Sequence, residues 1–81
     1  MRLVVFFDLP VESAAQRKAY RQFRQFLVKD GYLMLQESFY AKLAVNEAAA
    51  GASVARLRKN RPAEGLVQVL RVTERQYATM D

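Results

Sequence analysis

The sequence predicts an α+β fold in which one antiparallel sheet is covered by two helices. Two kinds of segment indicate this fold: short runs rich in β-branched and aromatic residues, and longer segments whose apolar residues recur at helical spacing. The third indication is the order in which they alternate, with strands at both ends. The 81 residues carry no linker or repeat, so we expect residues 1–81 to form a single domain.

The opening residues, MRLVVFFDLP, predict a strand that is apolar on both faces and ends at Asp8. Side chains alternate along a strand, so the odd-numbered residues from 3 to 7 point to one face and Val4 and Phe6 point to the other. A sheet covered on one side alternates apolar with polar residues, and this strand does not. Pro10 has no N–H to donate and ends the strand.

A capping box formed by Ser13 and Gln16 predicts a helix that runs to about Lys29 or Asp30, where Gly31 stops it. Its apolar residues form one stripe, which we expect to face the core: Ala19, Tyr20, Phe23, Phe26 and Leu27.

Two short β-rich runs follow, over 32–36 and 38–44, and are predicted to be consecutive antiparallel strands. In the first of them, alternation places Tyr32 with Met34 and Leu33 with Leu35. Further along, three more elements are predicted from caps and periodicity: a helix from Asn46-Glu47 to about Lys59, a strand over 65–72, and a short helical turn that begins at a second capping box, Thr73 to Gln76.

The order strand, helix, strand, strand, helix, strand predicts a ferredoxin-like β-α-β-β-α-β arrangement. Its four-stranded antiparallel sheet carries both helices on one face and leaves the other face open. Because the strands are apolar on both faces, something must cover the open one. A second copy of the chain is the economical candidate, so we expect a homodimer.

Composition restricts the chemistry. The chain has no histidine and no cysteine, which leaves carboxylates and hard cations as the available metal chemistry. Asp8, at the end of an apolar strand, fits a cation ligand, although a carboxylate at such a position is more often a turn residue that caps the next segment. Glu12, Glu37 and Glu64 are alternative ligands, although each falls at a turn or strand end. If two copies of Asp8 face one another across a two-fold axis, they could share a Mg²⁺ or Mn²⁺ ion.

Thirteen Lys and Arg residues against eight Asp and Glu give a net charge of +5, which favours an anionic partner. Two groups of basic residues stand out: a ridge at helical spacing, Arg17, Arg21 and Arg24, and a cluster near the end of the second helix, Arg56, Arg58, Lys59 and Arg61. Such groups contact nucleic-acid phosphates, and they also occur as solvated helix faces. No apolar run is long enough to cross a membrane, so we expect a cytoplasmic protein with no membrane association.

Four ordered blocks resemble the CRISPR-associated protein two family: MRLVVFFDLP, RKAYRQFRQFL, GYLMLQESFY and RLRKNRPAEGLVQVLRVTERQY. The resemblance implies a ferredoxin-like homodimer that binds duplex DNA with the CRISPR integrase, associated protein one, in a heterohexamer that acquires spacers. It places the Mg²⁺ position on Asp8, the Gln-x-Ser-aromatic element on Gln36, Ser38 and Phe39, and the basic first-helix positions on Arg17, Arg21 and Arg24.

The same resemblance implies an alternative activity, because some members of the family are metal-dependent endonucleases on single-stranded RNA or on DNA. The chain most resembles the form of the family found with single-effector CRISPR systems. Members of that form usually continue into a further strand after the TERQY block, a C-terminal extension that we expect this chain to lack. A DNA scaffold is the first hypothesis and a Mg²⁺-dependent endonuclease that uses Asp8 the second. A small regulatory or toxin-like ribonuclease module is a third, which explains the four blocks poorly.

Overall fold

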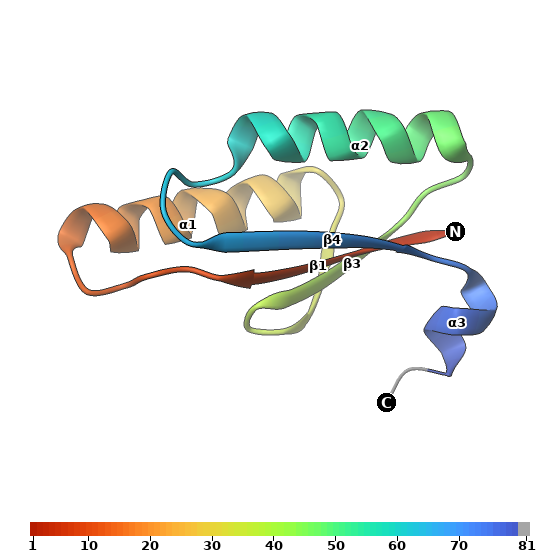
Figure 1. The fold of residues 1–81 in the computed structure, drawn as a ribbon, viewed down its shortest axis with the longest axis horizontal. Coiled ribbons are helices and arrows are strands. Elements are labelled where there is room, and N and C mark those ends of the chain that lie inside the picture. Colours follow the sequence, from red (N-terminus) through yellow and green to blue (C-terminus); the bar gives the residue numbers. More distant parts are fainter. Residues whose placement is uncertain (80–81) are drawn as a thin grey trace.

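The computed structural model describes residues 1–79, and its architecture confirms the predicted ferredoxin-like fold. A single four-stranded antiparallel sheet has the strand order β2-β3-β1-β4, and helices α1 and α2 cover one face of it (Figure 1). The elements are β1 (Arg2–Asp8), α1 (Ala14–Lys29), β2 (Leu33–Gln36), β3 (Phe39–Leu43), α2 (Glu47–Asn60), β4 (Leu66–Val72) and α3 (Glu74–Ala78).

The helices begin where their capping residues predict. The Ser13 hydroxyl accepts from the Gln16 amide at 3.0 Å while the Gln16 side chain accepts from the Ser13 amide, as a capping box requires. Asn46 caps α2 through a bond of 2.8 Å from the Ala49 amide, and a second capping box opens α3 at Thr73.

The end of α1 explains why β2 begins one residue later than predicted. Gly31 has a φ of +94°, and its amide donates to the Val28 carbonyl. The Tyr32 amide donates to the Leu27 carbonyl at 2.9 Å, which completes a Schellman motif. Tyr32 therefore closes the helix and does not join the sheet ladder.

The core lies between the sheet and the two long helices. Leu3, Val5 and Phe7 of β1 are buried against Phe23 and Leu27 of α1, as the alternation predicted. The ring of Phe7 packs edge-on against that of Phe23, with 5.2 Å between the ring centroids. The aromatic residues of α1 are therefore core packing, which leaves the basic residues of that helix on its outer surface.

The opposite face of the sheet is open and apolar, as predicted from the first strand. Four leucines on it are between 52 and 69% exposed, namely Leu33, Leu43, Leu66 and Leu70. The predicted alternation in β2 is interrupted by a register shift between Met34 and Gln36, so that Leu33 and Gln36 both lie on the open side, opposite Ala41 and Phe39.

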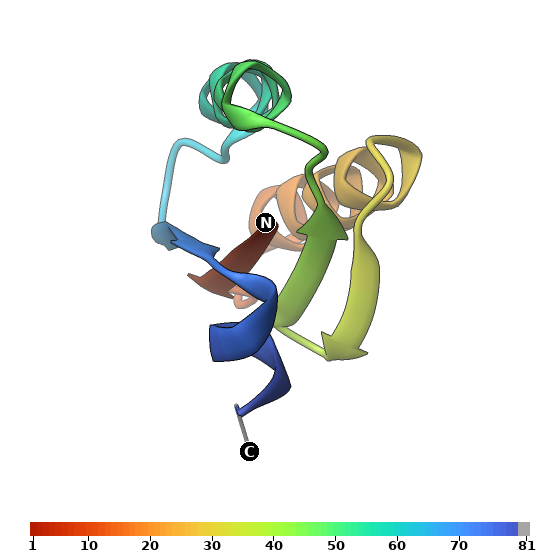
Figure 2. The ribbon, with the colours of Figure 1, turned by 90° about the vertical axis from the view of Figure 1, so that its right-hand side faces the viewer.

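Helix α3 lies on the open side of the sheet, away from α1 and α2 (Figure 2). Arg2 of β1 holds it there, because its Nε is 3.1 Å from the Glu74 carboxylate and its guanidinium carbon lies 4.5 Å from the centre of the Tyr77 ring. Val4 and Ala41 on this face are buried, whereas its four leucines remain more than half exposed within residues 1–79. No helix in the described part of the chain is long and apolar enough to span a membrane.

Candidate nucleic-acid and metal site

Asp8 is the last residue of the central strand β1, where it lies opposite Leu66 of β4 with its side chain exposed. Gly65, which directly precedes β4, lies against the backbone of Asp8. A Cβ at position 65 would lie 2.7 Å from the Asp8 carbonyl oxygen, and its φ of +94° also disfavours any side chain. The glycine thus lets the loop before β4 pack directly on the backbone of Asp8.

The structure brings Asp8 together with the three motif residues assigned by resemblance. Gln36, Ser38 and Phe39, from β2, the following turn and β3, line one hollow of about 470 Å³ with Asp8. The sequence analysis assigned Asp8 and this element separately, and it is the fold that places them side by side. This hollow opens on the apolar side of the sheet, and we call it the Asp8 hollow.

Four further residues line the Asp8 hollow and were missed by the sequence analysis: Phe6, Phe7, Leu66 and Gln68. Strand register places Phe6 and Gln68 in a row that crosses all four strands, in the order Gln36, Phe39, Phe6, Gln68. The two central rings stack with 4.7 Å between their centroids. The sequence signal for Phe6 is its alternation with Asp8, whereas the place of Gln68 depends on the pairing of β1 with β4.

A single chain offers one carboxylate to a cation at the Asp8 hollow. Within residues 1–79 no three carboxylate residues cluster as a metal site. The alternative ligands are not among the residues that line the hollow, and Glu64 instead accepts a hydrogen bond of 2.9 Å from the Gln16 side chain. One carboxylate is within the range that Mg²⁺ uses, because the ion usually takes one or two carboxylates and keeps several waters, and a copy of Asp8 from another molecule would supply the second.

The three arginines of the α1 ridge differ in their contacts. Arg17 donates to the carbonyls of Val11 and Glu12, at 3.3 and 2.8 Å, and so braces the loop before the helix. The Nε of Arg24 donates to the Tyr40 hydroxyl at 3.2 Å, and this hydrogen bond raises the pKa of Arg24 further. Arg21 is exposed, and none of the three pairs with a carboxylate in the described residues.

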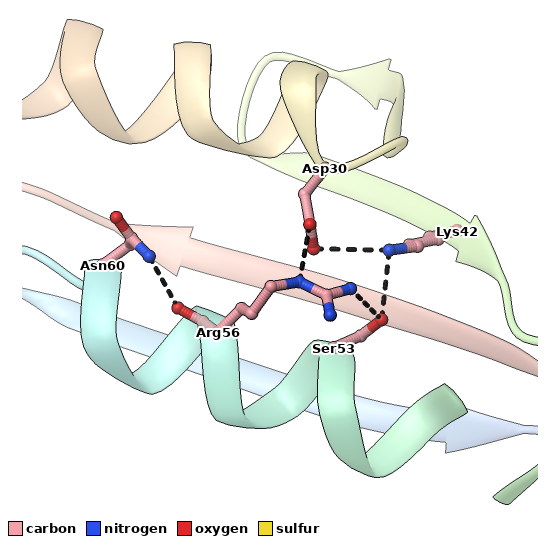
Figure 3. A network of polar contacts seen from close by, with 5 residues as sticks. All are labelled: Asp30, Lys42, Ser53, Arg56 and Asn60. Carbon is pink, nitrogen blue, oxygen red and sulfur yellow. Dashed lines mark hydrogen bonds and ion pairs between the residues drawn. The ribbon is translucent and has the colours of Figure 1, made fainter. Parts of the chain in front are cut away.

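Arg56 lies in a polar network that joins the end of α1 to β3 and α2 (Figure 3). Its Nε is 2.7 Å from one Asp30 oxygen, and Lys42 Nζ is 3.3 Å from the other. The buried Ser53 hydroxyl accepts from both cations at 3.0 Å. Seven basic residues were predicted to contact nucleic acid, and Arg56 has the least support among them because Asp30 already pairs with its charge. Its contact with nucleic acid stays a prediction.

Tyr32 lies beneath this network, with Lys42 Nζ 5.3 Å from the centre of its ring. Its buried hydroxyl has no hydrogen-bond partner in the described part of the structure. Burial, followed by the negative charge of Asp30, raises the pKa of Tyr32 to about 12. In the same way, burial and then the charge of Glu37 raise the pKa of Tyr20.

The remaining basic residues, Arg58, Lys59 and Arg61, are exposed at the end of α2 and make no ion pair within residues 1–79. Arg58 and Arg61 line a second hollow of about 310 Å³, which Lys59 does not line. Leu66 lines both this hollow and the Asp8 hollow, so the two are neighbours at one end of the molecule.

Comparison with known proteins agrees with the resemblance read from the four blocks. The family described as CRISPR associated protein Cas2 matches residues 1–80. Proteins named CRISPR-associated endoribonuclease Cas2 from Acidovorax ebreus, Treponema denticola and Streptococcus mutans UA159 are 52, 49 and 48% identical to this chain. The alignments cover 99, 100 and 99% of it and 78, 80 and 73% of those proteins.

The fold has a close counterpart among solved structures. The crystal structure of Streptococcus pyogenes Cas2 at pH 6.5 superposes with a TM-score of 0.75, over 100% of this chain and 96% of that one. The sequence identity in that superposition is 20%, so the likeness bears on the fold alone.

Proposed function

The chain belongs to the CRISPR associated protein Cas2 family, and on that premise we propose that it works in CRISPR adaptation as a homodimer that binds duplex DNA together with the CRISPR integrase. The observation that carries this proposal is the separation of two surfaces. One face of the sheet is apolar and open, whereas the helical side carries basic residues without acidic partners among residues 1–79.

The open face supports the homodimer. An apolar face of this kind is characteristic of a protein interface, and a two-fold axis lets the same surface cover itself. Leu66 and Leu70 lie on β4, and Leu33 and Leu43 lie on β2 and β3, so the exposed leucines extend across the sheet. Face-to-face pairing through these residues would bury them in both copies.

The basic residues support the contact with DNA. Arg17, Arg21 and Arg24 on α1 and Arg58 and Arg61 at the end of α2 present guanidinium groups to solvent. Such groups contact backbone phosphates and release counterions, without reading the base sequence. In a dimer, each set of basic residues is present twice, which gives one duplex a longer basic surface to contact.

The test is the salt dependence of duplex binding, measured by fluorescence anisotropy. Arg21→Gln removes an exposed, unpaired charge, and Arg71→Gln is the matched control because Glu47 already pairs with Arg71 at 2.8 Å. We expect Arg21→Gln to weaken binding and to reduce the slope of log K against log salt by about 0.9 for each lost phosphate contact, with Arg71→Gln unchanged. Equal effects of the two variants would contradict a specific role for the α1 ridge.

A second candidate function is a metal-dependent endoribonuclease, favoured by the Asp8 hollow and by the relatives, which are named CRISPR-associated endoribonuclease Cas2. In the proposed dimer, two copies of Asp8 meet near the axis and supply two carboxylates to one Mg²⁺ or Mn²⁺ ion. A bound ion of this kind would stabilise charge on a phosphoryl oxygen and activate a water. Ser38 and Gln36 would then contact the RNA strand beside the ion.

A Mg²⁺-titrated cleavage assay on labelled single-stranded RNA tests this candidate, with Asp8→Asn and Glu12→Gln compared side by side. Both variants remove one exposed carboxylate, but only Asp8 lines the hollow. We expect cleavage by the wild type and by Glu12→Gln, and none by Asp8→Asn. Cleavage by all three proteins would indicate a contaminating nuclease.

A further inference from the structure

The hollow at the end of α2 has the composition of an anion site. Arg58 lies in the last turn of the helix and Arg61 is its C-terminal cap residue, and both line the hollow together with the loop that leads to β4. Among residues 1–79, no acidic residue lines it. Within residues 1–79 neither guanidinium donates a hydrogen bond or pairs with a carboxylate, so the donors of both remain available.

The same hollow is tied to Asp8 by the backbone. Gly65 lines it, and the position of a Cβ on this glycine is 2.7 Å from the Asp8 carbonyl oxygen. Leu66, directly opposite Asp8, lines both hollows. A strand of nucleic acid that reaches Asp8 from this side therefore passes the two arginines first.

The charge balance at this end of α2 favours an anion. The carbonyl groups at a helix C-terminus carry a partial negative charge of about half a unit, which opposes anion binding. The two full positive charges of Arg58 and Arg61 outweigh it. Guanidinium groups also match the geometry of phosphate oxygens through paired N–H donors.

We propose that Arg58 and Arg61 form a phosphate subsite, which holds one backbone phosphate of a single-stranded RNA whose neighbouring segment lies in the Asp8 hollow. This inference rests on the nuclease candidate above and deepens it, because it assigns the direction from which the strand reaches Asp8. Lys59, between the two arginines in sequence, is outside the subsite.

The experiment measures binding separately from cleavage. Arg58→Gln, Arg61→Gln, the double variant and Lys59→Gln are made in an Asp8→Asn background, and their affinity for a labelled 12-nucleotide single-stranded RNA is read by anisotropy. Lys59→Gln is the matched control, since it removes the same charge from the same turn. Loss of a charge-assisted contact is expected to weaken binding about tenfold for each arginine variant, and Lys59→Gln by less than about twofold.

The double variant distinguishes one shared phosphate from two separate contacts. If both arginines hold a single phosphate, the double variant loses far less than the product of the two single losses. The subsite would be overturned if the affinity loss of the double variant equals the product of the two single losses. It would also be overturned if Lys59→Gln weakens RNA binding as much as the arginine variants do. A duplex DNA of the same sequence serves as a second probe. If the variants lose affinity for the duplex by the same factors as for the RNA, the assignment to a single strand is overturned.

Cleavage kinetics with Asp8 intact separate the two proposals. Arg58→Gln and Arg61→Gln should raise KM for the RNA about tenfold and leave kcat unchanged, as expected for a contact made equally in the ground and transition states. If the wild type does not cleave while the binding pattern holds, the nuclease candidate fails and the phosphate subsite stands. If it cleaves and KM is unchanged in both variants, the subsite fails alone.

Discussion

Asp30→Asn should destabilise the fold more than any single change to a surface ion pair. The substitution keeps the shape of the side chain and removes the negative charge that lies between Lys42 and Arg56 (Figure 3). The side chains of Asp30 and Lys42 are only 14 and 17% exposed, whereas that of Arg56 is 47% exposed. The loss therefore leaves one largely buried ammonium group without its counter-charge.

The expected size of the loss follows from these exposures. Removing one partner of a fully buried pair costs about 3–5 kcal/mol, and an exposed pair contributes about 0–1 kcal/mol. Lys42 keeps its hydrogen bond to Ser53, and Arg56 regains water, so we expect an intermediate value of about 2 kcal/mol. At about 1 kcal/mol per molar urea for a domain of this size, the unfolding midpoint falls by about 2 M.

The assay is urea unfolding followed by circular dichroism at one fixed protein concentration, since dimerisation would add a concentration-dependent term. Arg71→Gln, which breaks an exposed pair with Glu47, is the control and should cost less than about 1 kcal/mol. Adding Lys42→Met to Asp30→Asn should restore part of the loss, because an apolar replacement removes the unpaired charge. Equal midpoints for Asp30→Asn and Arg71→Gln would refute the reasoning.

Three further predictions concern other parts of the molecule. Tyr32→Phe removes a buried hydroxyl without a partner in the described structure and should stabilise the fold by about 1 kcal/mol at pH 7. The pKa of Tyr32 is about 12 in the folded protein and about 10 in the unfolded chain, so the wild type should lose about 1.4 kcal/mol of stability per pH unit between pH 10 and 12. Tyr32→Phe should not show this loss. An equal loss in the variant would contradict the assignment of the pH dependence to Tyr32. Gly65→Ala should destabilise the fold by about 1–3 kcal/mol in urea unfolding, because position 65 has a positive φ and a Cβ there would contact the Asp8 carbonyl. Gly51→Ala, whose Cβ meets nothing within 4 Å, should stabilise the fold by up to about 1 kcal/mol. Similar effects of the two substitutions would contradict the packing described for Gly65. Leu70→Glu should convert the proposed dimer into a monomer of 9.3 kDa in sedimentation equilibrium. Val45→Glu, at an exposed apolar position in the loop between β3 and α2, should leave the dimer intact. A wild-type protein that already sediments at 9.3 kDa would contradict the dimer.

The sequence by itself determined what depends on neighbours along the chain. Ser13 with Gln16, Asn46, and Thr73 with Gln76 placed the helix starts, because a capping side chain bonds to amides two or three residues away. Alternation in the first strand identified the two apolar faces of the sheet, since side-chain direction in a strand follows residue parity. The place of Asp8 at the end of the apolar first strand made it a candidate ligand, and the four blocks identified the family.

Only the tertiary structure decided which distant groups share a surface. Gln68 reaches the Asp8 hollow through the register of β1 with β4, and Arg56 is paired by Asp30, which precedes it by 26 residues. Arg58 and Arg61 separate from Lys59 because the end of α2 and the loop before β4 fold over a hollow that sequence spacing does not reveal. Such pairings depend on strand register and helix packing, which sum many weak contacts over the whole domain and leave no signal at any single residue.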